Sequence, residues 1–258
     1  MAMDRAQLQR RPLVAGNWKM HKTIAQTRAF IAELRTHDLP LGEVDAVICP
    51  PFTALRAAGE LLAGSGIGLG AQNVCWAEEG AFTGEIAPSM LVECGVTWVV
   101  IGHSERRHLF GELDYRVNEK ARAALAHGIT PIVAVGETAQ EHATGSARDK
   151  VVAQVKAAFD GMPRDDVARC VVAYEPIWAI GTGNADTPEE ADEIMGEIRA
   201  AVPGLALVRV LYGGSVKPDN VAAFVAQPNI DGGLVGGASL EPASFAALLE
   251  GARKGMAA

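Results

Sequence analysis

Short apolar runs recur at intervals along the chain. They begin at Leu13, Val44, Ile67, Thr97, Ile129, Arg169, Leu207 and Asp231. Within most of them the apolar residues are continuous and do not alternate with polar ones, which is typical of parallel strands buried on both faces. The pattern therefore predicts eight β-strands in a parallel sheet.

The segments between these runs have the periodicity of helices. Residues 27–35, 117–128 and 189–202 are the clearest examples. Thr187 and Pro188 suit the start of the last of these helices, and Gly128 suits the end of the second. The spacing of the runs leaves room for one crossover helix after each strand.

Alternating strands and helices in this number predict a single-domain (β/α)8 TIM barrel, a fold of the α/β class. A doubly wound open sheet is the alternative. Pro131, inside the fifth run, is a mild objection to a strand there, because proline cannot donate a ladder hydrogen bond. No linker rich in Pro, Gly or Ser divides the chain. We expect a short N-terminal extension over residues 1–11 and one barrel domain over residues 12–258.

Charge and cysteine usage narrow the choice of partners and compartment. The net charge of -8 disfavours nucleic acid and anionic membrane surfaces, which select a basic face. No apolar stretch is long enough to span a bilayer, and the first residues lack the apolar block of a secretory signal. The cysteines are scattered without the spacing of a disulfide framework or a zinc site. We expect a cytoplasmic protein with no membrane or nucleic-acid partner.

Polar residues at the carboxyl ends of the strands are the candidates for chemistry, because ligands of both architectures bind there. Asn17 and Lys19 follow the first run and are separated only by Trp18. In an extended chain they would point to one side and Trp18 to the other. On this evidence alone, the better explanation is that Asn17 forms a turn and that Lys19 is a solvated surface residue.

His103 lies where the fourth run gives way to the expected start of a helix. The positive end of a helix disfavours an imidazolium, so a histidine there could act as a neutral hydrogen-bond donor. Taken alone, His103 is more easily explained as a structural residue. We interpret the following Arg106 and Arg107 as structural as well.

Glu175 ends the sixth run and is followed by a proline and an apolar segment that contains Trp178 and Ile180. Such a flap could close over the acid, exclude water and raise the basicity of its carboxylate. Permanent packing of these apolar side chains against the barrel explains the segment equally well.

Pairs of glycines follow the last two runs, in "YGGSV" (Tyr212 to Val216) and "LVGGASL" (Leu234 to Leu240). Glycines let a backbone approach a ligand closely, and successive N–H groups form a cradle for an anion. Two such segments after the seventh and eighth strands match the phosphate site that recurs in barrel enzymes. No Ser/His/Asp order, Walker loop or metal motif is evident.

Together these motifs closely resemble the triosephosphate isomerases. The resemblance begins at about Pro12 and is carried by "AGNWKMH", "AQNVCWAEEGAFTGE", "IGHSERR", "AYEPIWAIGTG", "YGGSV" and "LVGGASL". It implies interconversion of dihydroxyacetone phosphate and D-glyceraldehyde 3-phosphate through an enediolate. It further implies that Glu175 is the base, that His103 is a neutral electrophile, and that Lys19, with Asn17 beside it, is the cation that steadies the intermediate.

The resemblance also implies how substrate and subunits are held. The phosphate would be bound at Gly181, Ser215, Gly236 and Gly237. A lid would consist of Pro176, Ile177, Trp178, Ala179, Ile180, Gly181, Thr182 and Gly183. The family is dimeric, so we expect a homodimer in which Thr83 lies near the partner's active site. Neither a cofactor nor a metal is implied, and the substrate is a small phosphorylated triose.

Two departures and two alternatives remain. The family often has a cysteine where this chain has Ala134, and we expect this difference to affect packing near Glu175. The family commonly has Lys-Thr-Ala where this chain has Asn184, Ala185 and Asp186, and we expect this difference to affect the timing of the lid. Another phosphate-binding barrel enzyme, such as a sugar-phosphate epimerase, typically needs a metal or a second acid. A non-catalytic binding protein would predict damage at Lys19, His103 or Glu175, and all three are present.

Overall fold

The fold is seen in a computed structural model, which describes residues 10–180 and 186–257. Eight parallel strands form a closed barrel in the order in which they occur in the chain. They are β1 (Leu13–Asn17), β2 (Asp45–Cys49), β3 (Gly68–Ala71), β4 (Trp98–Ile101), β5 (Thr130–Val135), β6 (Val171–Tyr174), β7 (Arg209–Tyr212) and β8 (Gly232–Val235). The predicted single-domain (β/α)8 barrel is confirmed.

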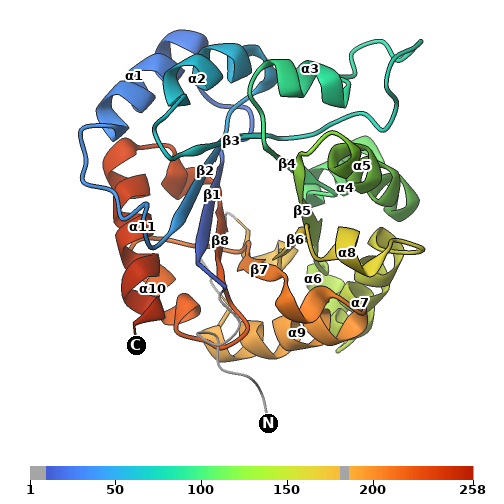
Figure 1. The fold of residues 1–258 in the computed structure, drawn as a ribbon. Helices are drawn as coiled ribbons and strands as arrows, with labels where there is room; N and C mark the ends of the chain where they lie inside the picture. The colour runs from blue at the N-terminus through green and yellow to red at the C-terminus, as the bar shows by residue number, and fades with distance from the viewer. Residues whose placement is uncertain (1–9, 181–185, 258) are drawn as a thin grey trace.

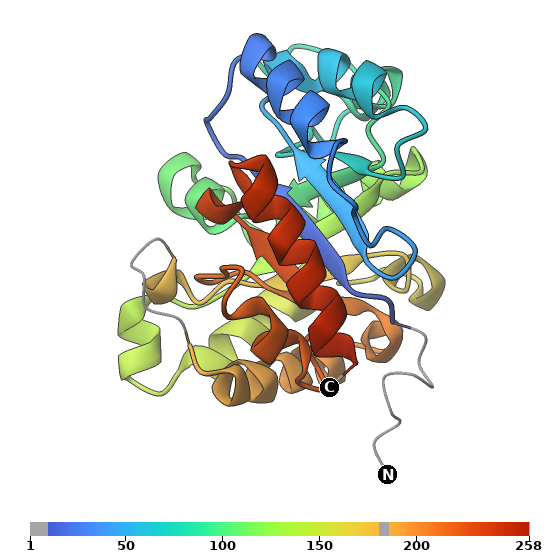
Figure 2. The same cartoon turned by 90° about the vertical axis from the view of Figure 1, so that its left-hand side faces the viewer.

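Helices surround the barrel on its outside (Figure 1). They are α1 (Ile24–Leu34), α2 (Leu55–Leu62), α3 (Pro88–Glu93), α4 (Ser104–Phe110), α5 (Asp114–Ala126), α6 (Ala139–Ala143), α7 (Ala147–Ala158), α8 (Arg164–Val167), α9 (Pro188–Ala201), α10 (Val221–Val225) and α11 (Pro242–Met256). The long helix α11 lies across the barrel wall in Figure 2, where it contacts α1, α10 and β1. Of the helices that are described, none is both long and apolar enough to cross a membrane.

Closure of the barrel between β8 and β1 rules out the open sheet. Leu13 pairs with Gly232, and the pairing continues to Gly16 and Val235. A side chain at residue 232 is impossible there, because its Cβ would lie 1.9 Å from the carbonyl oxygen of Leu13, and the backbone of Gly232 has a φ of 133°. This seam therefore depends on a glycine.

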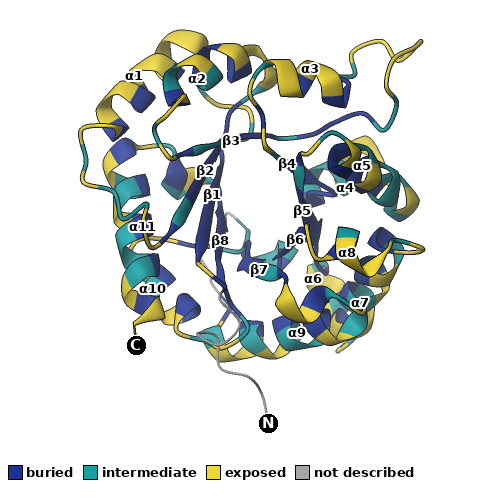
Figure 3. Ribbon diagram, viewed as in Figure 1, coloured by how far each residue is buried: buried dark blue, intermediate teal, exposed yellow. Residues whose placement is uncertain are grey.

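Two apolar layers explain why the strands read as continuous apolar runs. On β1, Leu13 and Ala15 point into the barrel, where they pack against residues such as Val47 and Leu211. Val14, between them, packs outward against the helices. Figure 3 shows the resulting pattern, with buried strands inside and exposed residues on the outer faces of the helices. Successive residues thus point to opposite sides, but both sides are dry.

Local signals set most element boundaries. The helix α1 begins three residues before the expected one, because the Thr23 side chain accepts a hydrogen bond from the Gln26 N–H and forms a capping box. Thr187 caps α9 as predicted, and Gly128 follows α5 with a φ of 73°. The strand β5 includes Pro131, which stands near its start, where a missing donor is tolerated.

At the amino ends of the strands, buried ion pairs tie the chain together. Asp231 accepts a hydrogen bond from Arg10 Nε at 3.0 Å and also contacts Arg199. Arg10 is only 6% exposed, so the packed part of the chain begins at least that early. The boundary between an extension over residues 1–11 and the barrel domain stays a prediction.

Candidate active site

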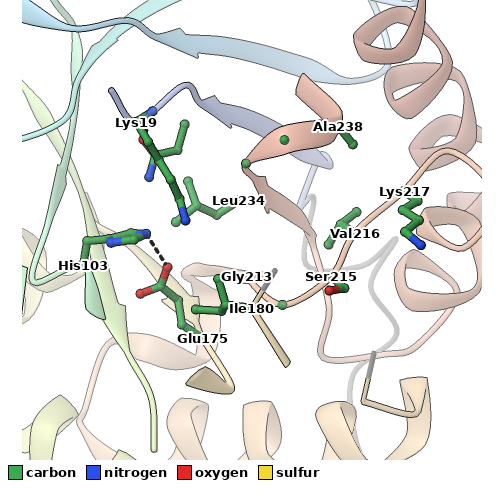
Figure 4. A pocket seen from close by; sticks show the side chains of 14 residues that line it. Lys19, His103, Glu175, Ile180, Gly213, Ser215, Val216, Lys217, Leu234 and Ala238 are labelled. Atoms are coloured by element: carbon green, nitrogen blue, oxygen red, sulfur yellow. Dashed lines mark hydrogen bonds and ion pairs between the residues drawn. The ribbon is translucent and has the colours of Figure 1, made fainter. Parts of the chain in front are cut away.

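The carboxyl ends of the strands surround a cavity of about 310 Å³. Parallel strands in a closed barrel all end on the same side, so loops far apart in the sequence meet there. The expected site residues that line the cavity are Asn17, Lys19, His103, Glu175, Ile180, Ser215, Gly236 and Gly237. Figure 4 shows the side chains of Lys19, His103 and Glu175 converging on its centre. Of the other expected residues, Gly181, Thr182 and Gly183 lie outside the described residues.

Glu175 and His103 form a buried pair. The Nε2 atom of His103 lies 2.9 Å from Oε1 of Glu175, and both side chains are almost fully buried. The other carboxylate oxygen, Oε2, accepts a hydrogen bond from the backbone N–H of Ser104 at 3.0 Å. The carboxylate is therefore satisfied by two donors at the start of α4, although it is cut off from water.

The hydrogen bonds of His103 identify its neutral tautomer. Its Nδ1 atom accepts a hydrogen bond from the backbone N–H of Glu105 at 3.2 Å. A ring nitrogen that accepts a hydrogen bond carries no proton, so the proton of the neutral ring lies on Nε2 and is donated to Glu175. This geometry agrees with a neutral donor at residue 103.

The pKa values of the pair depend on their contact. Burial lowers the pKa of His103, but the neighbouring Glu175 carboxylate outweighs it, so the pKa lies above its ordinary value. Burial likewise raises the pKa of Glu175, yet His103, the Ser104 N–H and Lys19 together hold it below the usual range. The helix start alone was expected to disfavour the imidazolium, and the direct contact with Glu175 acts in the opposite direction. If the carboxylate moves away, burial and Lys19 still lower the pKa of His103, and among the neighbouring charges only Glu105 still raises it.

Lys19 reaches the cavity through an unusual backbone conformation. Its φ is 51°, in the left-handed region, so the expected extended geometry is wrong at this residue. Asn17 Oδ1 accepts the N–H of Lys19 at 3.1 Å, and Trp18 points into the core against Phe30. Gln72, which the sequence did not single out, donates its side-chain amide to the carbonyl of Lys19 at 2.9 Å. Such a strained residue, held by its surroundings, is typical of functional sites.

Glu105 was also missed as a member of the site. Its carboxylate lies 2.7 Å from the ammonium group of Lys19 and remains partly exposed. An anionic substrate must compete with this carboxylate for the lysine. Glu105 lies in the first turn of α4, far from Lys19 in the chain, so the sequence gives no sign of the contact.

The glycine segments after β7 and β8 line the other side of the cavity. A Cβ at residue 236 would lie 3.6 Å from Cε of Lys19, so the lysine stem runs close to this segment. Gly213 has a different role from the one expected: a Cβ there would approach Cγ of Glu175 to 2.8 Å, so this glycine leaves room for the acid. Lys217, a second cation that the sequence did not single out, lies at the edge of the cavity (Figure 4).

The described part of the expected lid is a short 3₁₀ helix, Ile177–Ala179, that follows Pro176. Trp178 is not among the residues that line the cavity, and it donates its indole N–H to Oε1 of Glu137 at 2.7 Å. Of the lid residues that the structure describes, only Ile180 lines the cavity. Glu137, another residue that was missed, is fully buried, and burial raises its pKa.

Two further contacts anchor the segments around the lid. Ser215 donates its hydroxyl to the carbonyl of Ala179 at 2.7 Å. Beyond the undescribed residues, the backbone N–H of Asp186 donates to the hydroxyl of Tyr212 at 3.1 Å. Burial and then a hydrogen bond with Glu190 raise the pKa of Asp186 to about 7. A carboxyl group that titrates near neutrality thus replaces the alanine that is common at this position.

The remaining expected residues lie as follows. Ala134 is buried in β5 and pairs with Ala173 of β6. Ala173 precedes Glu175 by two residues in the chain. Arg107 donates to the carbonyl oxygens of Gly102 and Ala134, which agrees with a structural role. Thr83 is exposed on the segment between β3 and α3, away from the cavity of its own chain. Within residues 10–180 and 186–257, no cluster of His, Cys, Asp and Glu has the makings of a metal site.

Comparison with known proteins agrees with this geometry. The family model described as triosephosphate isomerase matches residues 12–252. The triosephosphate isomerase of Chloroflexus aurantiacus is 53% identical over 240 residues, which is 91% of this chain and 96% of that protein. That of Symbiobacterium thermophilum is 49% identical over 96% of this chain and 99% of its own. That of Pelobacter propionicus is 50% identical over 93% and 98%. This chain belongs to the triosephosphate isomerase family.

Proposed function

We propose that the chain interconverts dihydroxyacetone phosphate and D-glyceraldehyde 3-phosphate, as the family assignment and the cavity both support. The observation that carries the proposal is the contact of the buried Glu175 carboxylate with Nε2 of His103, with the ammonium of Lys19 lining the same cavity. A base, a neutral donor and a cation around one space suit removal of a proton next to a carbonyl group. A sugar-phosphate epimerase is not favoured by the relatives, and a non-catalytic protein would have no need of this arrangement.

In the proposed reaction Glu175 acts twice, first as a base and then as an acid. The substrate phosphate lies at Ser215, Gly236 and Gly237, and the two substrate oxygens face His103 and Lys19. Glu175 leaves His103 and removes a proton from the carbon next to the carbonyl group, whose oxygen takes the electron pair. His103 Nε2–H and Lys19 stabilise the resulting enediolate. Glu175 then returns the proton to the neighbouring carbon, while a hydroxyl proton passes between the two oxygens.

A coupled assay tests this proposal. The purified chain should convert D-glyceraldehyde 3-phosphate at a rate that a chelator does not change. Glu175→Asp should fold normally but turn over about a hundredfold more slowly, because the shorter side chain misplaces the carboxylate. The control is Glu189→Asp in the exposed first turn of α9, which should keep full activity. Full activity of Glu175→Asp would remove Glu175 from the role of base.

The charge of Glu175 should depend on His103. Because His103 lowers the pKa of Glu175, His103→Gln should raise that pKa, and the acidic limb of kcat/KM should move to higher pH. Turnover itself should fall by about a hundredfold or more, since the electrophile is lost. The measurement is the pH profile, together with NMR titration of ¹³C-labelled glutamate carboxyl groups. His127→Gln, at a histidine that pairs with Glu78, is the control. An unmoved limb in His103→Gln would contradict the coupling.

We extend the proposal to a lid over residues 176–183, of which Pro176 to Ile180 are described. An enediolate phosphate in contact with water can expel its phosphate, so the intermediate must be kept dry. The bond from Trp178 to Glu137 and the presence of Ile180 at the cavity suit a segment that moves between two sets of partners.

Replacing residues 177–183 by a short polar turn should therefore leave the barrel folded and lower turnover steeply. Much of the remaining flux should go to methylglyoxal and inorganic phosphate, which a phosphate assay measures. Isomerisation at full rate without extra phosphate release would mean that the segment only packs against the barrel.

We also propose a homodimer that shares its active sites through Thr83. The segment between β3 and α3 extends from the body of the molecule (Figure 1) and carries the partly exposed Phe82 beside Thr83. A second cavity of about 400 Å³ adjoins His103 and Lys19 and is bordered by the exposed side chains of Met20 and Phe110. Apolar groups around a cavity suit burial against a second copy of the chain.

Light scattering should accordingly give the mass of a dimer, and Thr83→Arg should yield monomers with reduced turnover. A dilute monomer with full activity would overturn the shared site.

We further propose a cytoplasmic location, because all four cysteines are free thiols, as suits a reducing compartment. Cell fractionation would test the location.

A further inference from the structure

A separate cavity of about 590 Å³ lies at the amino ends of the strands. It is bordered by the first residues of four strands, namely Asp45 of β2, Thr130 of β5, Val171 of β6 and Arg209 of β7. The candidate active site lies at the opposite ends of the same strands, and the apolar interior of the barrel separates the two. Nothing in the proposed reaction uses this cavity at the amino ends of the strands.

Positive charge is concentrated in this cavity. Four arginines line it, Arg10, Arg11, Arg169 and Arg209, whereas Asp45 is the one acid among its described lining residues. The whole chain, by contrast, has a net charge of -8. Asp45 contacts both Arg11 and Arg209, so one carboxylate serves two guanidinium groups. The cavity is therefore positive within an acidic protein.

Arg209 is less exposed than Arg11 and Arg169. Its side chain is only 21% exposed, and its guanidinium group lies 5.2 Å from the centre of the Trp98 ring. Burial lowers the pKa of Arg209, although Asp231 opposes this effect. A guanidinium group has five donors, and among the described residues one of them is used, by Nη1 to Oδ2 of Asp45 at 2.5 Å. A guanidinium group that is held in one orientation and has most of its donors available can bind an anionic ligand at low entropic cost.

Arg11 and Arg169 lie at the rim of the cavity, and their side chains are about half exposed. Arg11 donates to the carbonyl of Gly42 at 3.4 Å, and Arg169 donates to the carbonyl of Leu125 at 3.2 Å. Arg169 also pairs with Asp166 at 3.4 Å, on the outer surface. Each guanidinium group is thus oriented by a backbone oxygen and keeps donors for another partner.

We propose that this cavity binds a phosphate-bearing anion between Arg209 and the rim arginines Arg11 and Arg169. Phosphate fits better than a carboxylate, because its oxygens point in several directions and can accept from guanidinium groups on different sides. A nucleic acid is disfavoured, since the positive surface is a concave pocket in an otherwise acidic protein. The residues that line this site include none of the groups of the proposed reaction and not Thr83.

Calorimetric titration of the whole protein with inorganic pyrophosphate tests the proposal. One equivalent of 2-phosphoglycolate per chain is added first, so that the catalytic cavity is occupied. We expect one pyrophosphate per chain, with an affinity that falls as salt is added. Arg11→Gln and Arg169→Gln should each weaken binding by about tenfold, the effect of losing one charge-assisted hydrogen bond. Neither variant touches the catalytic cavity, so both should keep the turnover of the unmodified chain.

Arg56→Gln is the matched control, because Arg56 is an exposed arginine paired with Glu60 on α2, far from the cavity in the chain and not among its lining residues. It should bind pyrophosphate like the unmodified chain. A second titration with a nucleoside diphosphate separates the sources of the phosphate: tighter binding than pyrophosphate, lost in the same variants, would identify a nucleotide. Absence of pyrophosphate binding to the blocked protein, or equal binding by Arg11→Gln, Arg169→Gln and Arg56→Gln, would overturn the proposal.

Discussion

Closure of a parallel sheet on itself is the constraint on which everything else in this structure depends. When β8 pairs with β1, every strand must end on the same side of the barrel, and the loops after β1, β4, β6, β7 and β8 then meet around one space. The same closure gathers the amino ends of the strands on the other side, where arginines collect. A tight contact between Gly232 and the backbone of Leu13 is therefore as important to the site as any residue within it.

In this structure the polar groups of the candidate active site contact one another. Glu175 is satisfied by His103 and the Ser104 N–H, Lys19 is paired with Glu105, and the indole of Trp178 donates to Glu137. His103 and Glu175 are almost fully buried, and a buried charge without a partner is costly, so these contacts stabilise the charged groups. In the proposed reaction, substrate binding exchanges these partners for groups of the substrate.

The contact between His103 and Glu175 shows how position sets protonation. The backbone N–H of Glu105 occupies Nδ1 and favours the neutral ring, while the Glu175 carboxylate favours the cation. Glu175 raises the pKa of His103 only while its carboxylate remains next to Nε2. In the proposed reaction the carboxylate moves to the substrate and no longer raises the pKa of His103. The neutral ring, which can donate a hydrogen bond to a developing oxyanion, is then favoured more than before.

Local residue patterns determined the elements of this protein and which residues are candidates for its chemistry. Continuous apolar runs predicted all eight strands, because both faces of a barrel strand are buried, and the motifs identified Asn17, Lys19, His103 and Glu175. Domain boundaries, site roles and the dimer remain predictions. Tertiary structure alone decided which groups touch: Glu105 at Lys19, Glu137 under Trp178, and Gly213 beside Glu175. The physical reason is that local signals act over a few residues of one chain segment, whereas these contacts join segments brought together only when the barrel closes.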